Sequence, residues 1–464
     1  MTFDARRDTL GRAQPGRLTY WCELAWLPPG RVAAGVAVQV DGSAITAVTE
    51  GVEPTAGVER LAGLVLPGLA NTHSHAFHRA LRGRTQAASR GRGSFWTWRD
   101  QMYSVVARLD PDTYLALARA VYAEMVLAGI TTVGEFHYLH HGTDGQPYDD
   151  PNSMGHALVD AAHDAGLRIT LLDTCYLTGG FDRPLEGAQL RFGDGDAQGW
   201  ATRAGELRAA YAEVPDVVVG AAVHSVRAVP AEQLSTVAHW ARTATAPLHA
   251  HVSEQPAEND QCRAAHGVSP TELLAAHGVL GPRSTAVHAT HLDEQDVALL
   301  ASTVTGVCLC PTTERDLADG IGPVTRLRDA GVTLTFGSDS HAVIDLFEEA
   351  RAAELDERLL TRARGHLSAA ELLQAATLAG HAALGFPAAG RLAPGAAADL
   401  VAVSLESVRT SGAVPDTAAE TVVFAASAAD VRDVVAGGRR VVRDGRHVLG
   451  DVGLLLRNAV RALL

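Results

Sequence analysis

The sequence predicts an α/β protein: a (β/α)8 TIM-type barrel with a small β-sandwich domain built from both chain termini. Three observations predict this class. Eight short apolar runs alternate with longer segments of helical period between Leu64 and Leu384. These runs are continuously apolar, as parallel strands covered on both faces are. Short strand-like runs separated by Gly, Pro and Asp occupy both ends of the chain. An open doubly wound sheet is the alternative to the barrel.

The eight expected barrel strands are Leu64–Asn71, Thr131–Phe136, Arg168–Thr174, Val217–Val223, Pro247–Ala250, Thr285–Ala289, Val304–Cys310 and Val332–Gly337. Helical segments lie between them. The clearest is Pro111–Leu127, because Pro111 suits a first helical turn and Gly129 suits the residue after a helix end. A second is Ala231–Thr243. The segment Gly83–Gly93 is expected to form a loop over the functional face of the barrel.

The terminal strands divide the chain into three expected segments. Residues 1–63 supply the N-terminal strands of the sandwich, 64–385 form the catalytic barrel, and 386–464 complete the sandwich. Strand-like runs fall within Leu18–Val48, Gly390–Val403 and Thr421–Leu449. The two ends can pair because both leave the barrel near the same place.

Composition excludes several classes of function. The chain has 464 residues and a formal net charge of −14, which disfavours a nucleic-acid partner. It contains no lysine, so all 39 basic residues are arginine. This absence excludes a Schiff-base lysine, a phosphate-loop lysine and a carboxylated lysine that bridges two metals.

The cysteines and the N-terminus indicate the compartment. Five scattered cysteines do not form a disulfide framework. The first twenty residues have no apolar stretch of a signal peptide, and no run approaches the roughly 18 apolar residues of a membrane helix. We therefore expect a cytoplasmic protein without a membrane partner.

Metal-binding residue types gather at four expected strand ends. His73 and His75 end the first strand, where residues i and i+2 point to the same side. The other three ends carry His249, His251 and Glu254; His288 and His291; and Asp339 and His341. The carboxyl ends of barrel strands form one face, so these side chains are expected to converge.

Three imidazoles and one carboxylate suit Zn²⁺, with Fe²⁺ or Mn²⁺ as alternatives. Such an ion can lower the pKa of a bound water to about 7. Glu254, three residues after His251, can carry protons beside that water.

These motifs resemble those of the amidohydrolase superfamily. The matching pieces are Pro67–His75, His251–Glu254, His288, Gly337–Asp339 and Gly390–Leu400. The resemblance implies that His73, His75, His251 and Asp339 hold one metal ion. It also implies that Glu254 and His288 handle protons and that Asp339 accepts the proton of the attacking water. Superfamily members with two metals bridge them through a carboxylated lysine, so a chain without lysine is expected to hold one.

Four further residues compete for these roles. His249 shares a strand face with His251, but the His-x-x-Glu spacing favours His251. His291 is expected behind His288. Cys308 and Cys310 are expected to pack in the core, because the chain offers no second cysteine pair to complete a thiolate site.

The remaining strand ends indicate the substrate. Arg99, Arg227 and Tyr138 directed at one pocket favour a carboxylate-bearing substrate, since arginine pairs bidentately with carboxylates. Surface charge is the alternative for both arginines. The segments Ser94–Arg99, Gly134–His140 and His224–Val229 are similar to the formimidoylglutamate deiminase branch of the superfamily.

The branch resemblance implies that Arg99, Tyr138, His224 and Arg227 hold the two carboxylates of N-formimino-L-glutamate. His78 stands where this branch tends to have glutamine, and we expect it near the amino-acid end of the ligand. The implied reaction is metal-dependent hydrolytic deimination to N-formyl-L-glutamate and ammonia, in histidine degradation, by a homodimer.

One alternative function is open, and two others do not fit the residues, because no metal ligand is missing and no thiolate set is present. A deaminase of a heterocycle, such as guanine, cytosine or an adenosine derivative, would use the same metal chemistry. A non-catalytic scaffold would have lost metal ligands. A structural zinc protein would close its site with thiolates.

Overall fold

The computed structural model describes residues 17–86 and 95–464, except the side chains of 95–97, 99 and 100. Most of the loop expected over Gly83–Gly93 therefore lies outside the described residues. So does the side chain of Arg99, although its backbone belongs to helix α1.

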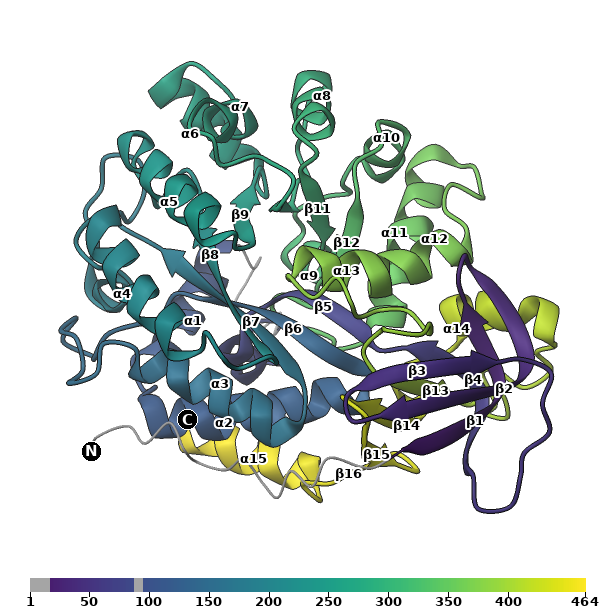
Figure 1. Ribbon diagram of the computed structural model, residues 1–464. Coiled ribbons are helices and arrows are strands. Elements are labelled where there is room, and N and C mark those ends of the chain that lie inside the picture. Colours follow the sequence, from purple (N-terminus) through teal and green to yellow (C-terminus); the bar gives the residue numbers. More distant parts are fainter. Residues whose placement is uncertain (1–16, 87–94) are drawn as a thin grey trace.

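Eight parallel strands form the barrel that the sequence predicts (Figure 1). They are β5 (Leu69–Ser74), β6 (Ile130–His137), β7 (Arg168–Cys175), β8 (Val217–Val223), β9 (Leu248–Val252), β10 (Ser284–His288), β11 (Gly306–Leu309) and β12 (Leu334–Phe336), and they pair in this order. Asp339, just past β12, closes the ring: its N–H donates to the carbonyl of His73, and its carbonyl accepts from the N–H of His75. The open-sheet alternative is therefore wrong.

The first predicted strand, Leu64–Asn71, is shared between two sheets. Its first part belongs to β4 (Glu59–Pro67) of the terminal sheet, and its second part to β5 of the barrel. Gly68 is the junction. A Cβ atom there would lie 2.0 Å from Thr131 Oγ1 and 2.9 Å from Asp399 Cβ, so only glycine fits.

Strands from both termini meet in one mixed sheet of eight, which confirms the predicted second unit. Its strands are β1 (Leu18–Leu27), β2 (Arg31–Asp41), β3 (Ala44–Thr49), β4, β13 (Leu400–Val403), β14 (Val431–Ala436), β15 (Arg439–Arg443) and β16 (Arg446–His447). The two ends join where β4 pairs antiparallel with β13, with Leu66 opposite Val401. This sheet has its own apolar core, which includes Tyr20, Val38 and Leu61.

Part of the expected strand region Thr421–Leu449 is helical. Helix α14 (Ala418–Ala425) covers its beginning and packs against α11 and α12. A short apolar run does not by itself distinguish a strand from a buried helix, and tertiary contacts decided here. Helix α15 (Val452–Ala462) then lies along α2, below the barrel in Figure 1.

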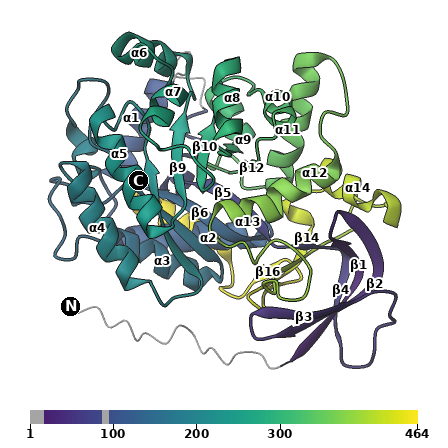
Figure 2. The same ribbon diagram turned by 45° about the horizontal axis from the view of Figure 1, so that its top comes forward.

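The remaining helices surround the barrel, as the turned view shows (Figure 2). They are α1 (Phe95–Val106), α2 (Pro111–Leu127), α3 (Ser153–Ala165), α4 (Ala197–Ala210), α5 (Ala231–Ala244), α6 (Pro256–His266), α7 (Pro270–Ala276), α8 (Glu294–Ser302), α9 (Pro311–Leu317), α10 (Val324–Asp329), α11 (Leu346–Thr361), α12 (Ala369–Gln374) and α13 (Gly380–Ala383). Short 3-10 helices lie at Ala76–Leu81, Gly187–Arg191, Pro415–Thr417 and Ala428–Asp430, and a π-helical turn lies at Ala375–Ala379. Helix α2 has the predicted bounds, and the Asp110 carboxylate caps it by accepting from the Thr113 N–H.

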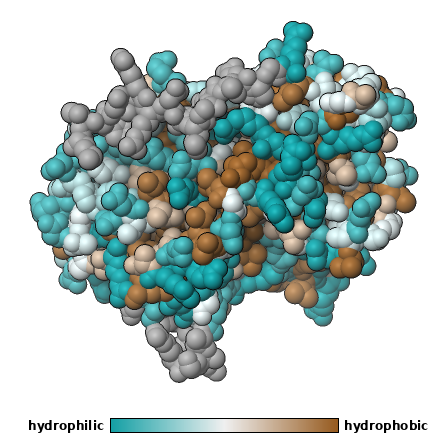
Figure 3. Space-filling model, turned by 90° about the horizontal axis from the view of Figure 1, so that it is seen from below, coloured by the Kyte–Doolittle hydropathy of each residue, from teal (hydrophilic) through white to brown (hydrophobic). Residues whose placement is uncertain are grey.

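None of the described helices has the length and apolar character needed to cross a membrane. On the face seen in Figure 3, hydrophobic side chains form a band that hydrophilic ones border.

Candidate active site

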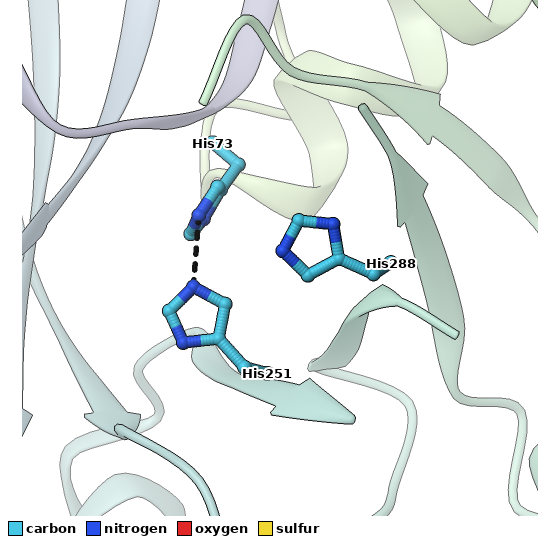
Figure 4. A group of neighbouring side chains, drawn as sticks. All are labelled: His73, His251 and His288. Atoms are coloured by element: carbon cyan, nitrogen blue, oxygen red, sulfur yellow. Dashed lines mark hydrogen bonds between the residues drawn. The ribbon is translucent and has the colours of Figure 1, made fainter. Parts of the chain in front are cut away.

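Four predicted metal ligands converge at the carboxyl end of the barrel. Asp339 Oδ1 lies 3.3 Å from Nε2 of His73 and 3.3 Å from Nε2 of His75. His73 Nε2 in turn lies 3.1 Å from His251 Nε2. All four side chains are buried. Figure 4 shows the imidazoles of His73 and His251 facing each other, with His288 beside them.

The hydrogen bonds of the imidazoles favour a cation between them. His75 Nδ1 lies 3.0 Å from the carbonyl oxygen of Phe136, and His251 Nδ1 lies 2.8 Å from that of His224. A carbonyl oxygen only accepts, so each Nδ1 carries the proton and each Nε2 presents a lone pair. Burial lowers the pKa of both histidines well below the ordinary value. Neutral imidazoles aimed at one carboxylate are the donor set of a single divalent ion.

The backbone at the site is strained. Asp339 has a φ of 41° and His288 a φ of 66°, both in the left-handed region that non-glycine residues rarely adopt. Each such residue costs of order 1–3 kcal/mol, and such strain gathers at functional sites. The neighbouring strands hold these conformations because Asp339 closes the barrel and His288 ends β10.

A group of charged side chains adjoins the metal ligands. His288 Nε2 lies 3.8 Å from Asp339 Oδ2 and 3.8 Å from Glu254 Oε1, and its Nδ1 lies 3.5 Å from Glu314 Oε1. Burial alone lowers the pKa of His288, but the charges of Glu254, Glu314 and Asp339 raise it well above the ordinary value. His288 therefore lies among three carboxylates, in a position suited to hydrogen bonding with a polar substrate.

A cavity of about 610 Å³ opens onto this group. It is lined by three of the metal-site residues, by both proton-handling candidates and by the described substrate candidates: His75, His251, Asp339, Glu254, His288, His78, Tyr138, His224 and Arg227. His78 Nε2 lies 3.1 Å from the Tyr138 hydroxyl. Burial lowers the pKa of His78 to about 3, so this ring is neutral.

Arg227 brings positive charge to the cavity. Its Nε donates to Glu258 Oε2 at 3.3 Å, and its Nη2 lies 3.9 Å from Glu254 Oε2. This contact places the guanidinium beside a candidate proton carrier.

The competing residues lie elsewhere. His249 is buried deeper in the barrel, with Nε2 3.4 Å from the Ala383 carbonyl, and does not line the cavity. His291 Nε2 lies 2.8 Å from the Asp319 carbonyl. Cys308 and Cys310 are fully buried together with Val287. Cys310 also lies near His288 and Asp339, but burial raises the pKa of its thiol well above the ordinary value.

Sequence reasoning missed a buried network that supports the metal ligands. Glu135 accepts from Ser74 Oγ at 2.7 Å and from the Ala76 N–H at 2.7 Å, and so holds the Ser74 side chain before His75 and the backbone after it. His341 lies between Ser74 and Ser338, and Asn71 donates to Ser338. Two sequence features could have indicated this network. One is Glu135, a carboxylate within an apolar strand, and the other is His341, which lies two residues after Asp339.

A second histidine cluster lies apart from the metal ligands. His137, His140 and Asp173 are close enough to share an ion. However, the Asp173 carboxylate already accepts two bonds from Arg203 and one from Trp200. A buried guanidinium in that position disfavours a further cation, so we assign this cluster to the structure of the β6 and β7 ends.

Comparison with known proteins agrees with this geometry. A family model described as the amidohydrolase family matches residues 64–441. A formimidoylglutamate deiminase from Pseudomonas aeruginosa is 39% identical over 435 residues, which span 92% of this chain and 95% of that protein.

Two solved structures are similar over almost the whole chain. An amidohydrolase from Brucella melitensis has a TM-score of 0.90 and 34% identity, covering 96% of this chain and 99% of that one. An adenosine deaminase from Xanthomonas campestris with bound zinc has a TM-score of 0.83 and 25% identity, covering 97% and 98%.

Proposed function

The chain belongs to the amidohydrolase family and is a metal-dependent hydrolase, and from this premise we propose that it deiminates N-formimino-L-glutamate to N-formyl-L-glutamate and ammonia, a step of histidine degradation. The observation that carries the proposal is the partly buried Arg227 beside Glu254 in the cavity. A guanidinium there can hold a substrate carboxylate next to the reacting group. The 39% identity to a formimidoylglutamate deiminase supports the same substrate.

The metal would be held by His73, His75, His251 and Asp339. Zn²⁺ is the ion we propose, because the donor set suits it and a similar structure contains zinc. A divalent ion in this position would lower the pKa of a bound water to about 7, which supplies a nucleophile at neutral pH.

The protein side chains then move the protons. Asp339 accepts a proton from the attacking water, which adds to the formimino carbon. Glu254 donates a proton to the imino nitrogen, while His288 stabilises the tetrahedral adduct through Nε2. Asp339 then passes its proton to the same nitrogen, which departs as ammonia, and the hydroxyl proton of the adduct returns to Glu254. The C–N bond breaks as the formyl C=O forms, and water supplies the oxygen. Tyr138, His78 and His224 orient the amino-acid portion, and we assign Arg99 to substrate binding as well.

Deamination of a heterocycle is the second candidate, because a similar structure is an adenosine deaminase. A purine pocket has less need of a guanidinium, and Arg227 in the cavity therefore favours the dicarboxylate. Ammonia release from N-formimino-L-glutamate, guanine, cytosine and adenosine distinguishes the two. Release from a heterocycle alone would overturn the proposal.

Two variants test the mechanism. We expect Glu254→Gln and Asp339→Asn to lower ammonia release from N-formimino-L-glutamate by at least about 10³-fold, because each removes a proton carrier. Circular dichroism should show an intact fold in both. Metal analysis should find about one ion per wild-type chain, and chelation should abolish turnover reversibly. Retained turnover in either variant would contradict the assigned roles.

A further inference from the structure

Glu314 of helix α9 lies on the Nδ1 side of the His288 ring. Its Oε1 is 3.5 Å from Nδ1, whereas the contacts of Asp339 and Glu254 with this ring are to Nε2. The side chains of Glu314 and His288 are both buried. The proposed deimination involves Nε2 and gives Glu314 no part, although this carboxylate lies directly behind a reacting group.

Glu314 and His288 are each other's available partners. Among the described side chains, Glu314 forms an ion-pair contact with His288 alone, while the adjacent Arg315 pairs with Glu348 and Asp356. Nδ1 of His288 likewise has no hydrogen bond within the described part of the chain. A buried carboxylate and a buried ring nitrogen both lose stability when unpaired. Since the carboxylate only accepts, Nδ1 is the donor of this pair.

The start of α9 fixes the position of the Glu314 carboxylate. Its Oε1 accepts from the Cys310 N–H at 2.9 Å, so the side chain folds back on the first turn of the helix. The Glu314 N–H donates to the Cys310 carbonyl at 3.0 Å, and the Glu314 carbonyl accepts from the Asp319 N–H at 2.8 Å. A carboxylate held in this way can orient the imidazole beside it.

His288 needs such a partner because only one orientation of its ring is productive. Nε2 lies 3.8 Å from Asp339 Oδ2 and 3.8 Å from Glu254 Oε1, at the reacting centre. Rotating the ring by half a turn about its Cβ–Cγ bond would put Cε1 in the place of Nε2. A carbon there cannot form the hydrogen bond to the tetrahedral adduct. The rotated ring would also lose the contact of Nδ1 with Glu314, so this contact favours the productive orientation.

We propose that Glu314 is a positioning residue for the deimination: it accepts the Nδ1 hydrogen of His288 and thereby directs Nε2 to the tetrahedral adduct. The inference rests on the proposed function, in which His288 stabilises that adduct. Glu314 does not line the cavity, so it acts through His288 and does not touch the substrate. The 3.5 Å contact is slightly longer than a hydrogen bond, and catalytic contacts of this kind tighten when the substrate is bound.

Two substitutions at Glu314 test this role in the zinc-loaded enzyme. Glu314→Ala removes the acceptor, and we expect kcat for N-formimino-L-glutamate to fall about 100-fold while KM changes less than about threefold. Glu314→Gln keeps an acceptor oxygen, which the Cys310 N–H can hold in place, so kcat should fall only about tenfold. Metal content should match the wild type in both variants, because Glu314 holds none of the proposed metal ligands. A loss of metal would contradict the positioning role.

Glu354→Gln is the matched control. Glu354 is also a buried glutamate whose carboxylate accepts from backbone N–H groups, those of Gly365 at 3.0 Å and Leu367 at 2.7 Å. It does not line the cavity. We expect its substitution to leave kcat and KM unchanged, whatever it does to the unfolding free energy.

A double-mutant cycle shows whether Glu314 acts through His288. In the His288→Asn background, Glu314→Ala should change kcat by less than about twofold, because the group that Glu314 positions is absent. With His288 present, the same substitution should cost about 100-fold. Equal losses in the two backgrounds would overturn the proposal.

A proton NMR signal provides a readout that does not depend on turnover. A hydrogen bonded between an imidazole nitrogen and a carboxylate resonates at low field, and the signal of His288 is identified by its absence in His288→Asn. We expect this signal to move upfield in Glu314→Gln, to disappear in Glu314→Ala and to be unchanged in Glu354→Gln. A wild-type spectrum without it, or a signal that survives Glu314→Ala, would refute the contact.

The outcomes distinguish the two proposals. If the wild type releases ammonia from a heterocycle and not from N-formimino-L-glutamate, the proposed substrate is wrong, and the cycle on that heterocycle and the NMR signal still test Glu314. If the wild type is active on N-formimino-L-glutamate and Glu314→Ala keeps its kcat, the assignment of Glu314 is wrong and the proposed function stands.

Discussion

His75 shows how single residues prepare this site. Its Nδ1 is fixed by the Phe136 carbonyl, so Nε2 faces the metal position. Glu135 holds the Ser74 side chain before it and the Ala76 N–H after it. Burial raises the pKa of Glu135 to about 7, while the bonds from Ala76 and Ser74 lower it. The ligand geometry therefore depends on a residue that does not reach the metal position.

We expect Glu135→Gln to weaken metal binding about 10- to 100-fold, the usual effect of removing a partner that orients a ligand. The amide offers one acceptor oxygen in place of two, so it cannot satisfy both Ser74 Oγ and the Ala76 N–H. Competition with a chromophoric chelator measures the affinity. Glu232→Gln on the exposed side of α5 is the matched control. Equal metal affinities in the two variants would refute the supporting role of Glu135.

At the scale of elements, the decisive feature is the junction of β4 and β5. One continuous apolar run passes from the terminal sheet into the barrel and ends at His73 and His75. The terminal sheet thus anchors the strand that carries two metal ligands. The terminal sheet is therefore connected to the active site through the continuous backbone of β4 and β5.

Gly68→Ala tests that junction. The added Cβ would overlap Thr131, so we expect a loss of about 2–3 kcal/mol in unfolding free energy, together with reduced metal content. Urea unfolding monitored by circular dichroism measures the unfolding free energy, and metal analysis measures the metal content. Gly205→Ala in α4, whose nearest neighbour would be 3.9 Å away, should be neutral or slightly stabilising. Similar unfolding midpoints for the two variants would contradict the close approach at Gly68.

For the whole molecule, buried neutral histidines make stability depend on pH. Burial lowers the pKa of His78 and His249 to about 3, and that of His140 and His381 to about 4. In the unfolded chain these groups titrate near pH 6.5. Between pH 6.5 and about 4 the unfolded state therefore binds protons that the native state does not, and the unfolding free energy falls as pH falls.

His381 allows this effect to be measured away from the metal ligands. It lies in α13, with Nδ1 2.9 Å from the Thr377 carbonyl. Each such histidine contributes a slope of up to about 1.4 kcal/mol per pH unit in this window. We expect the unfolding free energy of His381→Asn to depend less steeply on pH between 6.5 and 4.5 than that of the wild type. Parallel pH profiles would show that His381 is not a buried neutral group.

The sequence by itself determined the barrel, the convergence of the strand ends and the nature of the donor set. Continuous apolar runs specify strands buried on both faces, and the carboxyl ends of parallel strands share one side. His73, His251 and Asp339 could therefore be placed together although they are far apart in the chain. These are consequences of local pattern and strand direction.

Only the tertiary structure decided what depends on contacts between distant segments. It brought the Glu135 carboxylate within hydrogen-bonding distance of Ser74 Oγ. It also placed the Arg227 guanidinium next to the carboxylates of Glu254 and Glu258. It also made Ala418–Ala425 a helix. The hydrophobic periodicity of the sequence does not predict these features. Each depends on tertiary contacts, which determine the hydrogen-bond partners, the ion pairs and whether a short apolar segment forms a helix or a strand.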